Sequence, residues 1–172
     1  MTPMSLTGTR RAFTSIELIV ALAIMVVMGT IVVVSMGPAL GEARLRSGCR
    51  MILSALTYAR GYAVTRQTDT RVVLDKTGNG VCVEARVRDR NNVERLAPVT
   101  TPSGRYRRLP RGVAIVDVRG PEIDRDDSFV GFSQLGQADG AVITVVDARG
   151  KTRAITVDGI TGRCSVAIQH TE

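Results

Sequence analysis

The sequence predicts an α+β fold in which a long N-terminal helix packs on an antiparallel β-sheet head. Three features of the 172-residue chain support this prediction. They are an uncharged apolar run near the N-terminus, an apolar stripe with helical spacing after it, and an apolar alternation of period two from residue 70 onwards. We expect the helix over residues 13–66 and the β-rich head over residues 67–172. The first half of the helix is expected to span a membrane and the second half to be amphipathic.

The apolar run extends from Leu18 to Met36 and comprises 19 residues without a charge, of which 16 are hydrophobic. A helix rises about 1.5 Å per residue, so the run covers about 28 Å, close to the roughly 30 Å hydrocarbon core of a bilayer. Its Val and Ile content would also suit a buried strand, but its length and its lack of turn residues favour a helix. The run therefore predicts a transmembrane segment at about residues 16–36.

The charges before this run predict its orientation. Arg10 and Arg11 precede it, and the first 12 residues contain no acid. Because basic residues stay on the cytoplasmic side, we expect a cytoplasmic N-terminus and a head on the opposite side of the membrane. Residues 35–39 match the small-residue cleavage site of an ordinary secretory signal poorly, which favours retention of the apolar run.

Beyond Pro38 the apolar residues take helical spacing. Gly37–Pro38 is expected to bend the helix without ending it. Small Ala and Cys side chains in the stripe suit close packing against a sheet, although a coiled-coil seam is the alternative. Six residues recur at intervals of three and four and so share one helical face: Leu45, Cys49, Ile52, Leu56, Ala59 and Ala63.

From residue 70 the apolar period changes to two, which is typical of strands. Residues 71–74 and 81–87 flank Lys76–Gly80 in a hairpin pattern. The spacing of about ten to twelve residues favours an antiparallel meander, interrupted by a loop-rich insertion at residues 88–110. Five further strands are expected at residues 112–118, 129–132, 142–146, 152–157 and 163–168, with turns at 148–150 and 158–162.

Composition and motifs argue against an enzyme. The chain has one histidine, His170, no Trp and 3% aromatic residues, and it lacks GxSxG, HExxH and P-loop motifs. We therefore expect no catalytic residue, no metal site and no cofactor. Cys49, Cys82 and Cys164 form no CxxC pair. A single disulfide would leave one thiol over, and three small buried residues are the alternative.

An acidic residue stands at the membrane-embedded end of the apolar run. Glu17 lies between Ile16 and Leu18. An acid inside a spanning helix costs about 2.5–3.5 kcal/mol on insertion scales, so such a residue by default has a partner or a function. A position among the lipid head groups is the alternative, because Glu17 is near the end of the helix.

The segment Arg10–Leu18, with the sequence RRAFTSIEL, resembles the cleavage and methylation motif of type IV pilins and type II secretion pseudopilins. The resemblance implies that residues 1–12 are a short basic leader, which prepilin peptidase removes between Ala12 and Phe13. It also implies methylation of the new amino group of Phe13 and retention of the apolar helix as part of the mature protein.

The same resemblance implies a role for Glu17, which becomes the fifth residue of the mature chain. In the family this carboxylate pairs with the N-terminal amine of a neighbouring subunit as helices bundle into a filament. Two buried charges are tolerated when they meet, so the pairing would fix the axial register. The chain departs from the family at Ala12, where Gly is usual, and at Pro38, which lies further along the helix than is common.

The rest of the chain resembles one branch of this family, the pseudopilin H and FimT group, and so implies a pilin-like fold. The two resemblances together cover most of the chain and leave the central insertion unmatched. The resemblance to the pseudopilin H and FimT group rests on the helix at 43–63 and on four strand and turn segments, 132–136, 143–145, 153–157 and 162–163. It is the looser of the two resemblances, because residues of these types are common in strands and turns.

The resemblance implies a minor pseudopilin that assembles into the periplasmic pseudopilus of a type II secretion system and supports protein export. The expected partners are other pseudopilins or pilins, prepilin peptidase and inner-membrane lipid. The expected location is the inner membrane, crossed once, with the head in the periplasm. The alternatives are a FimT-like minor pilin of a type IV pilus, which would bind DNA during its uptake, and a membrane-tethered periplasmic binding protein.

A basic cluster at the end of the insertion and just beyond it is a candidate nucleic-acid contact. Arg105, Arg107, Arg108 and Arg111 surround Tyr106, and arginines beside an aromatic ring suit phosphate and base contacts. The net charge of +7 is compatible with an anionic partner and equally with ordinary solubility. The favoured interpretation is a solvated loop whose charge is offset by the acidic residues Glu122, Asp124, Asp126 and Asp127.

Overall fold

The structure is a computed structural model that describes residues 14–89, 93–120 and 128–168, apart from the side chains of residues 30–39 and 168. The chain divides into two compact units, Met1–Ala39 and Leu40–Glu172. The α+β class predicted from the sequence is confirmed. The described residues contain one helix, α1 (Ser15–Arg66), and nine strands: β1 (Thr70–Asp75), β2 (Gly80–Arg88), β3 (Glu94–Pro98), β4 (Arg107–Arg108), β5 (Val113–Arg119), β6 (Phe129–Phe132), β7 (Ala141–Asp147), β8 (Thr152–Val157) and β9 (Cys164–Ile168).

Thr14 caps the start of α1. The N–H of Glu17 donates to the backbone oxygen of Thr14 at 3.1 Å and lies 3.4 Å from its Oγ1, as expected for a threonine at the N-cap. The Thr14-x-x-Glu17 spacing is that of a capping box. The helix continues through Gly37–Pro38, so the prediction that this pair does not end the helix is confirmed.

The helix ends at Arg66 because the next residue leaves the right-handed helical conformation. Gln67 takes a φ of 49°, in the left-handed region. The N–H of Thr68 then donates to the oxygen of Ala63 at 3.1 Å, the long hydrogen bond of a Schellman C-cap. The Oγ1 of Thr70, the first residue of β1, donates to the oxygen of Ala59 at 3.0 Å and ties the strand to the helix.

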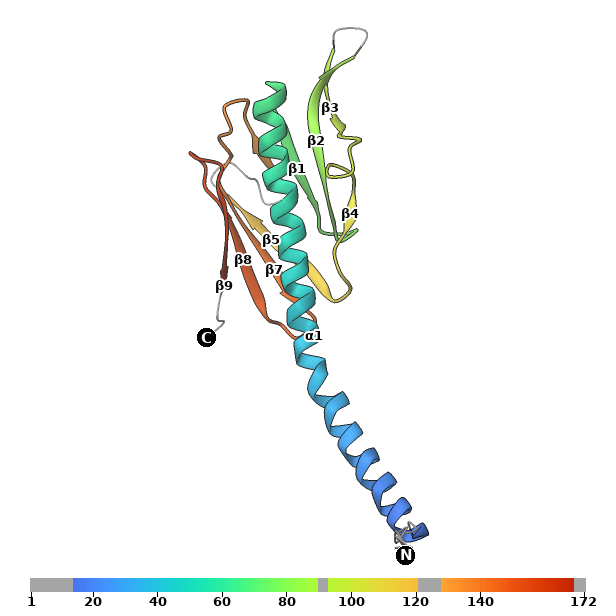
Figure 1. Ribbon diagram of the computed structural model, residues 1–172. Coiled ribbons are helices and arrows are strands. Elements are labelled where there is room, and N and C mark those ends of the chain that lie inside the picture. The colour runs from blue at the N-terminus through green and yellow to red at the C-terminus, as the bar shows by residue number, and fades with distance from the viewer. Residues whose placement is uncertain (1–13, 90–92, 121–127, 169–172) are drawn as a thin grey trace, which may run out of the picture. The chain divides into compact units, whose positions relative to one another are not determined.

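The strands form two sheets in which every pairing is antiparallel (Figure 1). The first has the order β3-β2-β1-β6, with β4 also pairing with β2. The second has the order β5-β7-β8-β9. The β1–β2 hairpin pairs Thr70 with Ala85 and Asp75 with Gly80, as the pattern around Lys76–Gly80 predicts.

The predicted meander is confirmed for β7, β8 and β9 and wrong for β6. Phe129–Phe132 pairs with β1 of the other sheet, with Val130 opposite Val72, and β5 therefore pairs directly with β7. The head consequently has two sheets where the sequence predicts one. An apolar alternation shows which face of a strand is buried, but it does not show which strand lies beside it.

The loop-rich insertion predicted at residues 88–110 contains two strands. β3 pairs with β2 in the register Arg86↔Leu96, and β4 pairs with the start of β2. β3 is largely exposed, and Arg88 donates to Glu94 at 3.0 Å across the ladder. Backbone pairing and ion pairs hold this strand, so its sequence lacks the apolar alternation that burial imposes.

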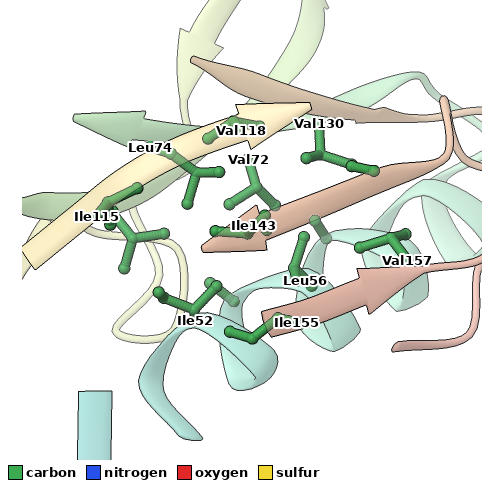
Figure 2. Packing of buried hydrophobic residues seen from close by; sticks show 14 of the residues in the cluster. Ile52, Leu56, Val72, Leu74, Ile115, Val118, Val130, Ile143, Ile155 and Val157 are labelled. Atoms are coloured by element: carbon green, nitrogen blue, oxygen red, sulfur yellow. The ribbon is translucent and has the colours of Figure 1, made fainter. Parts of the chain in front are cut away.

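One apolar core joins the amphipathic half of α1 to both sheets. The six stripe residues predicted to face the head are all buried. Figure 2 shows Ile52 and Leu56 of the helix among side chains of both sheets, including Val72 and Ile143. Two of the six stripe residues are alanines, Ala59 and Ala63, and Ala55 is buried in addition. Small side chains of this kind let a helix approach a sheet closely. The close packing on a sheet predicted from the stripe is confirmed.

Candidate functional site

The predicted processing site lies at the N-terminal end of the chain. Ala12 and Phe13 lie outside the described residues. Glu17 is in the first turn of α1, where the N–H groups of a helix favour a nearby carboxylate. Its side chain is exposed among exposed neighbours such as Ile16 and Leu18. The carboxylate therefore sits on a helical surface that is otherwise apolar.

The apolar surface of this segment is extensive. Among residues 16–28 ten large apolar side chains are between 51% and 70% exposed. Large exposed apolar surfaces mark sites of contact with protein or membrane. The sequence predicts a transmembrane segment at about residues 16–36, whereas among the residues that the structure describes no helical stretch is long and apolar enough to cross a membrane.

The four arginines of the predicted basic cluster do not point the same way. Arg107 is half-buried in β4, with its Nη2 3.5 Å from the oxygen of Met51 in α1. Arg105 is exposed and donates to the oxygen of Thr100 at 3.2 Å. Arg108 and Arg111 are exposed. At most three of the four can therefore meet an external ligand.

Tyr106, the aromatic residue of the cluster, is engaged in the β1–β2 turn. Its hydroxyl donates to Oδ2 of Asp75 at 2.9 Å, and its ring lies so close to Gly80 that a Cβ there would clash with Cζ of the ring. The N–H of Gly78 and the Tyr106 hydroxyl hold the pKa of Asp75 below its ordinary value. Desolvation and the Asp75 carboxylate raise the pKa of Tyr106. The ring is thus a structural part of the turn, which makes it a poor base-stacking platform.

The acidic residues expected to offset this cluster, Glu122, Asp124, Asp126 and Asp127, lie outside the described residues, as does His170. Within the described part of the chain, no three His, Cys, Asp or Glu side chains are grouped so that they could hold a metal ion. Cys49, Cys82 and Cys164 are free thiols. Burial raises the pKa of each, so all three are protonated at neutral pH.

Sequence reasoning missed a charged cluster at the start of the second unit. Arg153 of β8 donates to Oε1 of Glu42, and Arg46 and Lys151 each lie 3.9 Å from the same carboxylate. The turn between β7 and β8 is thereby fixed to α1. A signal was present, because Glu42 is the one acid between Leu18 and Thr68.

Comparisons with known proteins agree with this fold. The model of the family described as "Type II transport protein GspH" matches residues 49–162. No curated protein sequence matches the chain. Because the family is one of transport proteins, the expectation that the chain is not an enzyme is confirmed.

Solved structures share the fold at low sequence identity. Two structures of the minor pseudopilin EpsH from the type II secretion system of Vibrio cholerae superpose with a TM-score of 0.56 at 9% identity. They cover 73% and 77% of this chain and 97% and 99% of their own. The type IV minor pilin FimU of Pseudomonas aeruginosa superposes with a TM-score of 0.50 at 14% identity, over 75% of this chain and 90% of its own. The expected pilin-like head is therefore confirmed.

Proposed function

Because the chain belongs to the GspH family of type II transport proteins, we propose that it is a minor pseudopilin of a type II secretion system. It assembles with other pseudopilins into a periplasmic filament and supports protein export. The observation that carries this proposal is the family match over residues 49–162, which covers most of the packed half of α1 and strands β1 to β8 of the head. The likeness of the head to the EpsH minor pseudopilin supports it at the level of the fold.

The N-terminal segment supplies the means of anchoring and assembly. Prepilin peptidase cuts between Ala12 and Phe13, Phe13 is methylated, and residues at about 16–36 hold the protein in the inner membrane with the head in the periplasm. The motif RRAFTSIEL and the uncharged run Leu18–Met36 support this part of the proposal. The exposed apolar side chains of residues 16–28 supply the surface that lipid and neighbouring helices cover.

Glu17 sets the register of assembly. Its carboxylate is exposed on an apolar helical surface, and burying that surface between helices would strand a charge in a medium of low dielectric constant. The positively charged amine of Phe13 on a neighbouring subunit neutralises it. An unpaired buried charge is strongly unfavourable, so subunits that are displaced along the filament axis are rejected.

Replacing Glu17 tests this role. We expect Glu17→Leu to enter the membrane normally and to be absent from the filament, because the neighbouring amine then has no counter-charge. Ile19→Leu is the matched control, since Ile19 is also exposed on the first turns of the helix. Membrane fractionation and recovery in sheared filaments measure the two properties. Equal recovery of both variants would contradict the role of Glu17.

A minor pilin of a type IV pilus is the second candidate, and the fold shared with FimU favours it. The two functions differ in what is lost when the gene is inactivated. Loss of exported proteins from the culture medium supports the pseudopilin, whereas loss of pilus-dependent motility or of DNA uptake supports the pilin.

A further inference from the structure

The four sheet edges of the head differ in how they are protected. An edge strand exposes unpaired N–H and C=O groups, and proteins normally block such edges with charges, proline, bulges or covering segments. The first sheet has its edges at β3 and β6, and the second at β5 and β9. Three of these edges carry protection, whereas among the described residues β9 carries none of these devices.

Each of the three protected edges uses a different device. β3 contains Glu94 and Arg95 and ends in Pro98. β5 has a bulge between Ile115 and Asp117, and it carries Asp117 and Arg119 beyond it.

The β6 edge is covered by a single residue. The N–H of Gly131 donates to Oδ2 of Asp139 at 2.6 Å, and the N–H of Asp139 donates back to the oxygen of Gly131 at 3.3 Å. Asp139 therefore occupies the backbone groups that an added strand would need.

β9 has the sequence CSVAI, without a charge or a proline. Its register with β8 is continuous, from Val157↔Cys164 to Arg153↔Ile168, so no bulge interrupts it. Along its outer side no strand of the described residues pairs with it. In an antiparallel ladder alternate residues direct both backbone groups away from the neighbouring strand, so β9 presents a regular row of donors and acceptors that no strand in the described part of the chain uses.

The core-facing side of β9 is also incompletely covered. Val166 is 36% exposed, although Ile155, its partner on β8, is 0% exposed. Directly opposed residues share one face of the sheet, so the apolar layer that is complete at β8 remains open at β9. A further strand would cover Val166 and extend this layer.

A cleft of about 340 Å³ begins at the N-terminal end of β9. It is lined by Thr57 and Arg60 of α1 and by residues 162–165. Arg60 donates to the oxygen of Gly136 at 3.3 Å, and Arg163 is exposed. Of the residues that the structure describes, two with guanidinium groups and none with a carboxylate line the cleft, which suits an acidic side chain at that end of an added strand.

We propose that β9 accepts an extended, acidic strand from a neighbouring pseudopilin head, which lengthens the β5-β7-β8-β9 sheet across the subunit boundary. Backbone hydrogen bonds to β9 supply the affinity, as in other cases of strand addition. An acidic side chain at the arginine cleft supplies the specificity. This inference rests on the proposed function, because it takes the partner to be another subunit of the same filament.

The experiment compares the two edges of one sheet. Val166→Lys places an ammonium on the covered face of the added strand, and Val116→Lys places one on β5, at the opposite edge, where Val116 is exposed. Each full-length variant is co-expressed with the other minor pseudopilins of the same secretion system, extracted in mild detergent and purified by a tag. We expect Val166→Lys to lower recovery of the partner at least about tenfold, because burying an unpaired ammonium is unfavourable, and Val116→Lys to leave it unchanged.

Amide hydrogen exchange on the wild-type chain gives a second readout. It needs no substitution, so misfolding of a variant cannot affect it. We expect residues 164–168 to gain protection in the complex and residues 113–119 to keep the exchange of the isolated chain. Equal recovery of the partner with both variants, or unchanged exchange in β9, would overturn the inference while leaving the proposed function intact. Failure of the wild-type chain to recover any pseudopilin would instead refute the proposed function, and the inference with it.

Discussion

The two halves of α1 are built from similar apolar residues but differ in what covers them. In residues 16–28 the large apolar side chains are more than half exposed. In residues 45–63 the apolar stripe is buried against two sheets of the same chain. The apolar stripe of the second half is therefore covered within its own chain, whereas the described part of the chain leaves the apolar side chains of the first half exposed. In the proposed function, lipid and neighbouring subunits cover them. In the proposed function one helix is thus both an assembly element and part of a folded head.

Substitution of equivalent leucines in the two halves tests this comparison most strongly. Leu56 is 0% exposed and Leu22 is 54% exposed. We expect Leu56→Ala to lower the free energy of unfolding of the head by about 2–5 kcal/mol, because it removes buried methyl groups and leaves a cavity. Leu22→Ala should change it by less than about 0.5 kcal/mol. Denaturant unfolding of the full chain in detergent measures both, and similar losses would contradict the comparison.

Within the internally packed half, the ion pairs of Glu42 differ in burial and should differ in their contribution to stability. Arg153, whose side chain is 14% exposed, donates to Glu42, whereas Arg46, which is 57% exposed, lies 3.9 Å away. We expect Arg153→Ala to cost about 1.5–3 kcal/mol, the range for a hydrogen bond to a charged group. Arg46→Ala should cost less than about 0.5 kcal/mol, as exposed i,i+4 pairs do. Thermal unfolding of both variants checks the order, and a larger loss for Arg46→Ala would disprove it.

The Asp75 turn gives a smaller, pH-dependent effect within the head. The pKa of the Asp75 carboxyl is lower in the folded chain than in the unfolded chain. The ionised carboxylate therefore contributes stability above the unfolded pKa, and this contribution is lost as the pH falls through the folded pKa. We expect Tyr106→Phe to raise the pKa of Asp75 but to leave it below the ordinary value, because the N–H of Gly78 is the larger cause. Carboxyl NMR titration measures this shift, with Asp158, which is held by Thr161, as the unchanged control. An unaltered Asp75 pKa would show that the hydroxyl has no influence.

The exposed arginines of the insertion give the smallest expected effect. The structure directs Arg107 inward and ties Tyr106 to Asp75, so we expect the cluster to act as a solvated loop. Replacing Arg105, Arg108 and Arg111 by Ala should change the affinity of the full chain for duplex DNA less than about twofold at moderate salt. A loss of about tenfold, together with a flatter salt dependence, would establish a nucleic-acid contact instead.

Local sequence patterns predicted the extents of the helix and strands better than the pairing of the strands. The helical stripe from Leu45 to Ala63 and the strands at 129–132 and 152–157 have the predicted extents, because burial on one face leaves a period in the sequence. The pairing of β6 with β1 was not predictable in this way, since it is decided by packing between distant segments. β3 was missed because it is held by its ladder and by ion pairs rather than by burial.

The features of the candidate site likewise differ in whether they are local in the sequence. The motif around Phe13 and Glu17 is contiguous, so it can be read from the sequence alone. The Glu42 cluster and the open β9 edge depend on residues that are far apart in the chain, such as Glu42 and Arg153. The engagement of Tyr106 by Asp75 is likewise visible in the structure alone.

The most direct test of the account is the N-terminus of the mature protein. The proposal that residues 16–28 form an assembly surface requires that the leader be removed and the apolar helix retained. Mass spectrometry and N-terminal sequencing of the protein purified from membranes should find a chain that begins at an N-methylated Phe13. A chain that begins at Met1, or near Ala39 after loss of the apolar segment, would contradict the account.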